Sequence, residues 1–274
     1  MKKGFIFIAM LLLTAAFLLN GCGSKETSGN TENSGGRVTL KVLADQVPHA
    51  ELLEFVKPKL AQQGIDLKIT ILQNDHGNED TDNGEFDVNF FQHQPYLDSV
   101  KKEKGYDLAN VGNIHVEPIG LYSAKYKNKE EFPANAVIGI PNDVTNEYRA
   151  LKILEANGFI VLRPGLESHA ATVKDIAQYV KPVILKEIDS AQLIRLKEDL
   201  DGYITNTNKI LEAGIDANTA LFREGKDSPY ANILVTKSSR VNEPAIVALK
   251  NALQADEVKK FIAEKYKGAV IPAF

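Results

Sequence analysis

The chain has 274 residues, with 32 lysines and arginines against 36 aspartates and glutamates, which gives a formal net charge of −4. Such a mildly acidic chain lacks a basic surface, which argues against a nucleic-acid partner. The single cysteine, Cys22, leaves no partner for an internal disulfide.

The N-terminal segment predicts secretion and lipid modification. Lys2 and Lys3 precede an apolar run from Phe5 to Leu19, which is the pattern of a signal peptide over residues 1–21. A membrane-spanning anchor is the alternative, but the run is a few residues short of the roughly 20 that one needs. The sequence Leu19-Asn20-Gly21-Cys22 resembles the bacterial lipobox, which implies a diacylated Cys22. We therefore expect a lipid anchor in the cell membrane and a chain on the extracytoplasmic side.

A tether separates this anchor from the folded body. Residues 22–36 are rich in Gly, Ser, Asn and Thr and carry no large apolar side chain, as in flexible linkers. The body begins near Arg37 and is long enough for one large core or two smaller ones.

Strand and helix patterns alternate from the start of the body. Val38–Ala44 predicts a strand, and apolar residues at helical spacing follow from Pro48 to Gln62. Leu67–Leu72 alternates and predicts a second strand. A strand, a helix and a strand within about 35 residues predict a βαβ unit with parallel strands.

The pattern continues beyond a polar segment, Asn74–Glu85, that predicts a solvated acidic loop without the spacing of a calcium site. Predicted strands are Phe86–Phe91, Ala136–Ile140, Phe159–Leu162, Val183–Ile188, Gly202–Thr205 and Ala231–Thr236. Predicted helices are Pro95–Lys102, the segment from Asp143 to Gly158, Val173–Tyr179, Asn208–Ala213, Glu243–Leu253 and Asp256–Tyr266.

Two such α/β patterns, linked near Val116–Ser123 and Ala231–Thr236, predict two lobes with a hinge between them. We assign residues 37–119 plus 233–274 to the first lobe and residues 120–232 to the second. A ligand is expected in the cleft, where strand ends and helix N-termini meet.

Motifs for catalysis are missing from the sequence. It has no Gly-rich phosphate loop and no Gly-x-Ser-x-Gly, and its five histidines lack the spacing of a helical zinc site. No nucleophile–base pair in the sequence therefore supports a hydrolase function. We expect no enzymatic activity, no metal and no cofactor.

Three polar segments are candidates for binding a small ligand. Phe90–Leu97 combines aromatic, imidazole and amide groups at a strand-to-helix junction, although the end of a core strand would look the same. In Ile140–Leu151, Arg149 can bind a carboxylate bidentately, or it can pair with surface acids of its helix. Thr205–Asn208 presents two amides, or is an ordinary polar turn.

Together these segments resemble the NlpA family of lipoproteins, the methionine-binding components of ABC importers. The resemblance runs through the body in order: FFQHQPYL (Phe90–Leu97), HVEPIGLYS (His115–Ser123), IPNDVTNEYRAL (Ile140–Leu151), DSPYAN (Asp227–Asn232) and KKFIAEKYKGAVIPAF (Lys259–Phe274). It implies an α/β, two-lobed periplasmic-binding-protein-like fold with a ligand cleft between the lobes. It also implies delivery of methionine to an ABC permease. A monomer is the default expectation.

The resemblance assigns roles to particular residues. Phe91 matches the aromatic that packs on the ligand side chain, and His93 matches the nearby imidazole. Arg149 matches the residue that holds the carboxylate, with Asn146 beside it as a weaker candidate. Asn206 and Asn208 match an Asn-x-Asn whose amide meets the amino-acid end of the ligand.

Two positions depart from the family pattern. His76 and Lys209 stand where the family usually has tyrosines that border the ligand. These changes keep two alternatives open. One is a binding protein for a different amino acid or a short peptide, and the other is a surface interaction lipoprotein with a vestigial cleft.

Overall fold

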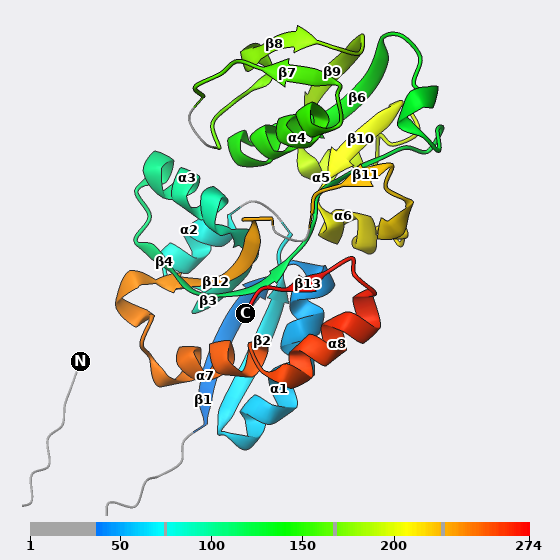
Figure 1. The fold of residues 1–274 in the computed structure, drawn as a ribbon. Helices are drawn as coiled ribbons and strands as arrows, with labels where there is room; N and C mark the ends of the chain where they lie inside the picture. The colour runs from blue at the N-terminus through cyan, green and yellow to red at the C-terminus, as the bar shows by residue number, and fades with distance from the viewer. Residues whose placement is uncertain (1–36, 74–75, 167–168, 226–227) are drawn as a thin grey trace, which may run out of the picture. The chain divides into compact units, whose positions relative to one another are not determined.

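The computed structural model describes residues 37–73, 76–166, 169–225 and 228–274 (Figure 1). The predicted signal peptide (1–21), the lipidated Cys22 and the tether (22–36) lie outside the described residues. Residues 37–274 belong to one compact unit. Within the described residues, no helix has both the length and the apolar character that crossing a bilayer requires.

The first sheet contains β1 (Val38–Ala44), β2 (Ile65–Ile71), β3 (Val88–His93), β4 (Leu108–Val116), β12 (Ala231–Lys237) and β13 (Ile271–Pro272). Their order across the sheet is β13-β4-β12-β3-β1-β2. β1 pairs in parallel with both β2 and β3, so the predicted βαβ unit is confirmed. β12 runs antiparallel to β3 and β4. Parallel β1 and β3 therefore end at the same edge of the sheet.

Helices pack on this sheet through the apolar faces that the sequence predicts. The helix between β1 and β2 is α1 (Glu51–Gln62), and the four apolar residues of its buried face are at most 1 % exposed. They are Leu52, Leu53, Val56 and Leu60. α1 contacts α7 (Pro244–Leu253) and α8 (Asp256–Tyr266), which confirms both predicted C-terminal helices. Burial of each such side chain contributes about 1.5–3 kcal/mol.

The second sheet contains β5 (Gly120–Tyr122), β6 (Ala136–Pro141), β9 (Val183–Ile188), β10 (Gly202–Thr205) and β11 (Phe222–Arg223), in the order β11-β5-β10-β6-β9. β6 pairs in parallel with β9 and β10. Helix α4 (Val144–Ala156) follows β6 and buries Leu151 and Leu154 against Ile138 and Ile140. This strand–helix order again places a helix N-terminus at a strand end.

The remaining elements are mostly short. They are α2 (Gly77–Asp82), α3 (Gln94–Lys104), α5 (Ser190–Leu193), α6 (Thr207–Glu212), the hairpin of β7 (Ile160–Leu162) and β8 (Ile176–Tyr179), and single turns at 46–50, 129–131, 173–175, 217–219 and 238–240. The chain passes between the two sheets twice, from β4 to β5 and from β11 to β12 (Figure 1). The lobe boundaries assigned from the sequence stay a prediction.

Two predicted elements differ from the structure. Residues 173–179 were expected to be helical, but they form a single turn followed by β8, which pairs with β7. Strand pairing therefore overrides local helical spacing there.

The predicted acidic loop contains the helix α2 in its described part. The buried face of α2 is polar, because Thr81 donates to the Gly77 carbonyl (2.7 Å) and accepts from Asn89 (2.9 Å). A polar buried face leaves no apolar periodicity in the sequence.

Candidate functional site

A cleft of about 740 Å³ opens at the ends of the strands of both sheets. From the first sheet and its loops come Asp45, Leu72, Phe91, His93 and Asn232. From the second come the N-terminal turns of α4, α5 and α6, with Asn142, Asn146, Ser190, Asn206 and Asn208. Five of the six ligand-binding residues predicted from the sequence therefore line one cavity, and Arg149 does not.

His93 is held in one tautomer. It is the N-cap of α3, where its Nδ1 accepts a hydrogen bond from the Tyr96 backbone N–H (3.2 Å). Nε2 is therefore the protonated nitrogen, and it donates to Asn146 Oδ1 (3.2 Å). Burial and the nearby Arg149 cation lower the pKa of His93 to about 3, so the ring is neutral.

Asn146 joins the two sides of the cleft. Asp143, the N-cap of α4, accepts from the Asn146 backbone N–H (3.0 Å) and from its Nδ2. Asn146 Oδ1 then accepts from His93 on the first sheet and from Asn206 Nδ2 (3.3 Å) on the second. Asp143 therefore fixes the orientation of the Asn146 side-chain amide that a ligand would meet.

Arg149 lies one turn further along α4 and is buried. Its Nε and Nη2 donate to the two carboxylate oxygens of Glu224 (both 2.6 Å), and Nη2 also donates to the Glu117 carbonyl (2.7 Å). Its guanidinium lies 4.4 Å from the centre of the Tyr230 ring. Arg149 thus ties α4 to both segments that connect the sheets. Its role in carboxylate binding stays a prediction.

Phe91 supplies an apolar wall. An added Cβ on Gly77 would lie 2.7 Å from Phe91 Cε1 and 3.2 Å from Leu72 Cδ1, so the ring packs against the bare backbone of α2. Phe91 is half-buried and lines the cleft. Of the two departures from the family pattern, Lys209 lines the cleft, whereas His76 is exposed beside Glu79 (3.2 Å) and is not among the lining residues.

Sequence reasoning missed the acidic floor of the cleft, formed by Asp45 and Glu117. Asp45 directly follows β1 and Glu117 directly follows β4, so the rule that ligands bind at strand ends could have found both. Burial raises the pKa of Asp45 to about 6 and also raises the pKa of Glu117. Lys209 Nζ lies 3.7 Å from Asp45 Oδ1 and 3.2 Å from Glu212.

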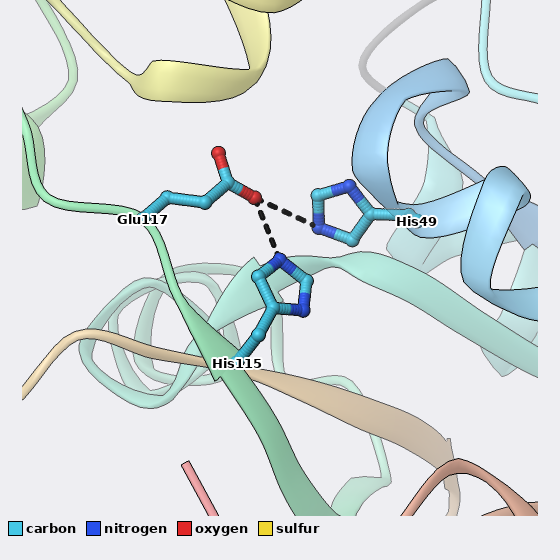
Figure 2. A group of neighbouring side chains, drawn as sticks. All are labelled: His49, His115 and Glu117. Carbon is cyan, nitrogen blue, oxygen red and sulfur yellow. Dashed lines mark hydrogen bonds and ion pairs between the residues drawn. The ribbon is translucent and has the colours of Figure 1, made fainter. Parts of the chain in front are cut away.

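Figure 2 shows two histidines that converge on Glu117. His115 Nε2 lies 2.8 Å and His49 Nε2 lies 3.5 Å from Glu117 Oε1, and all three side chains are buried. Burial lowers the pKa of His115 to about 3 and of His49 to about 4. The three ligand atoms lie within 4.8 Å of one another, close enough for a metal ion to be considered.

The nitrogens of this group fit hydrogen bonds better than a metal. His49 Nε2 also faces Asn232 Oδ1 (3.0 Å), so both Nε2 atoms face oxygen acceptors and carry the proton. The Nδ1 atoms of both rings are buried and have no hydrogen-bond partner among the residues that the structure describes. A metal-bound histidine almost always donates its other ring N–H, and in this part of the chain neither ring has an acceptor for it. The expected lack of a metal nevertheless stays a prediction.

Comparisons with known proteins bear on this cleft. A family model described as NlpA lipoprotein matches residues 40–274. The methionine-binding lipoprotein MetQ of Bacillus subtilis is 34 % identical over 99 % of both chains. The crystal structure of lipoprotein Tp32 from Treponema pallidum matches with a TM-score of 0.83 and 42 % identity, over 86 % of this chain and 100 % of that one.

A nutrient binding protein from Burkholderia cenocepacia, solved bound to methionine, matches with a TM-score of 0.82 and 36 % identity, over 86 % of this chain and 100 % of that one. These matches confirm the predicted α/β, two-lobed periplasmic-binding-protein-like fold with its cleft.

Proposed function

The chain belongs to the NlpA lipoprotein family, and we propose that it is an extracytoplasmic solute-binding protein that captures L-methionine, or a close analogue, for an ABC importer. The observation that carries this proposal is one cleft that gathers Phe91, His93, Asn146, Asn206 and Asn208. The methionine-binding names of the relatives support the choice of ligand.

The cleft has a chemically different place for each part of methionine. Phe91 offers an apolar face for the thioether side chain, and burial of that chain supplies binding energy in proportion to its area. Amides of Asn146, Asn206 and Asn208 suit the polar amino-acid end. A bidentate bond from Arg149 to the ligand carboxylate would have to share donors with Glu224, since Nε and Nη2 already donate there.

Closure of the lobes completes the mechanism. Lining residues come from both sheets, so a ligand that contacts both stabilises the closed arrangement relative to the open one. The protein performs capture and release without changing a covalent bond, and the closed form then docks on the permease. No lining residue is required as a nucleophile or a base.

Placement at the membrane completes the proposal. Removal of residues 1–21 and diacylation of Cys22 would anchor the protein on the extracytoplasmic face, with residues 22–36 as the tether. The lobes, residues 37–119 plus 233–274 and residues 120–232, would then act as one monomer.

A different ligand is the second candidate, and one observation favours it. Lys209 places a cation at the cleft, where the family resemblance leads us to expect an aromatic ring. Such a group favours a ligand with an additional acceptor, such as a more polar amino acid or a short peptide.

A thermal-shift titration tests both candidates. The protein is unfolded and refolded to remove carried-over ligand, and then titrated with L-methionine, D-methionine, the other amino acids and a dipeptide panel. A ligand at 100 times its Kd stabilises the folded state by about 2.7 kcal/mol. A shift with methionine supports the proposal, and a shift with another solute alone reassigns the ligand. If no small ligand shifts the melting temperature, the cleft is vestigial.

A further inference from the structure

We infer that a buried network of hydrogen bonds behind Phe91 sets the position of its ring, and with it the length of ligand side chain that the cleft accepts. This inference rests on the proposed function and concerns the part of the cleft that would receive the ligand side chain. The central residue of the network is Asn89, which is 0 % exposed and is not among the residues that line the cleft. Asn89 is therefore a positioning residue that acts through Phe91.

A β-bulge in β3 brings members of the network together. Between Asn89 and Gln92, two residues of β3 lie opposite one residue of β12. In a regular strand, residues three apart face opposite sides of the sheet, but here Gln92 Nε2 donates to Asn89 Oδ1 (2.8 Å). A bulge re-aims the side chains beside it. Of the two residues inside it, Phe90 is buried in the core and Phe91 lines the cleft.

Helix α2 faces β3 with polar side chains and contains no large apolar residue. Asn78 Nδ2 donates to Gln92 Oε1 (3.0 Å), and Gln92 Nε2 donates back to Asn78 Oδ1 (2.5 Å). Asn89 Nδ2 donates to Thr81 Oγ1 (2.9 Å) and to Asn78 Oδ1 (3.2 Å). Each amide nitrogen and oxygen in this network therefore has a partner. A buried polar network that is fully satisfied favours one arrangement of its members, so these bonds fix α2 on β3.

The position of α2 decides how far the Phe91 ring can move. The ring packs on Gly77, where an added Cβ would lie 2.7 Å from its Cε1. Thr81 donates to the Gly77 carbonyl (2.7 Å), and Asn89 Nδ2 lies 3.4 Å from the same oxygen. The network therefore holds the backbone on which the ring rests. Because Phe91 also lines the cleft, a shift of α2 would change the space that is left for the ligand side chain.

A double-mutant cycle, measured by isothermal titration calorimetry, tests this role. Asn89→Leu removes the hydrogen bonds of the side chain with little change in its volume, and it is expected to weaken L-methionine binding at least about 5-fold. In the Phe91→Ala background the same substitution should change the affinity less than about 2-fold, because the ring through which Asn89 acts is missing. In Asn89→Leu alone, the preference for L-methionine over L-ethionine, which is one methylene longer, should fall at least about 3-fold. A general loss of stability would not change that preference.

A control and a milder variant accompany the cycle. The matched control is Glu79→Ala on the exposed face of α2, which is expected to change the affinity less than about 2-fold. Thr81→Val removes one hydroxyl from the network and keeps nearly the same shape. If Asn89→Leu fails to fold, the cycle and the L-ethionine comparison are carried out with Thr81→Val.

The outcomes separate the positioning role from the proposed function. Equal effects of the network substitution in both backgrounds, or an unchanged preference over L-ethionine, overturn the inference and leave methionine capture intact. If Phe91→Ala itself leaves the affinity unchanged, the inference fails together with the role of Phe91, and capture again stands. If another solute binds in place of methionine, the same cycle is made with that solute and its homologue one methylene longer. If no small ligand binds, both proposals fail.

Discussion

Replacing Arg149 with alanine tests whether this residue stabilises the fold through its ion pair with Glu224, in addition to being a candidate for ligand binding. The side chains of Arg149 and Glu224 are 2 % and 11 % exposed, and the substitution leaves the Glu224 carboxylate buried without its cation. Removing one partner of a buried ion pair costs about 3–5 kcal/mol, and the slight exposure of Glu224 favours the lower end. The loss of the bond to the Glu117 carbonyl acts in the same direction.

Urea denaturation provides the assay. With an m-value of about 3 kcal/mol/M, a loss of about 3 kcal/mol lowers the midpoint by about 1 M. The double variant Arg149→Ala/Glu224→Ala removes both charges. Its loss in free energy of unfolding is expected to be smaller than the sum of the losses in the two single variants, by at least about 1 kcal/mol. The matched control is Lys152→Ala on the same helix, whose half-exposed ion pair with Glu155 should contribute less than about 1 kcal/mol.

A loss of less than about 1 kcal/mol in Arg149→Ala would contradict a stabilising role for the Arg149–Glu224 pair. Ligand binding is measured separately, under conditions where the variant is folded. If Arg149 also binds the ligand carboxylate, the affinity for methionine falls by about 100-fold, as for the loss of a buried charge-assisted pair. Affinity within 2-fold of wild type would leave Arg149 with the structural role alone.

Three further predictions concern the cleft and its floor. In Gly77→Ala the new methyl would lie 2.7 Å from Phe91 Cε1 and would displace the ring. Calorimetry should then show several-fold weaker methionine binding. Unchanged affinity would mean that the position of the ring is unimportant for binding. Phe91→Ala removes the apolar wall and should weaken binding by about 10- to 100-fold, equivalent to about 1.4–3 kcal/mol, which the same titration checks. In the folded protein the pKa values of His49 and His115 are lowered to about 4 and about 3. Their contribution to stability is therefore complete above the unfolded-state pKa near 6.5. It declines as the pH falls toward the folded-state values, because the unfolded chain takes up protons first. The pKa of Asp45, raised to about 6, acts in the opposite direction between pH 6 and 4, so the test compares two proteins. As the pH falls over this range, the urea midpoint of His115→Asn should shift upward relative to that of wild type. Parallel curves would contradict the prediction.

Local patterns in the sequence were sufficient for most of the fold. Val38–Ala44 is the same strand in the prediction and in the structure, and the apolar spacing of Leu52, Val56 and Leu60 predicts the helix face that is buried. These features depend on residues close in the chain, whose periodicity reflects one buried face. The five predicted cleft residues came from the family resemblance. They lie together because strand ends and helix N-termini in an α/β fold meet at one edge.

The tertiary structure alone decided which groups these residues meet. Arg149 and Glu224 are 75 positions apart, and His49 approaches Asn232 across 183 positions. No periodicity links such pairs, because their contact depends on how the two sheets pack and on where the connecting segments cross. Whether a charged side chain or an imidazole is neutral, paired or open to a ligand depends on its burial and on its neighbours at hydrogen-bond distance. The sequence therefore determined where the cleft lies, and the packing of distant segments determined its acidic floor and the partner of Arg149.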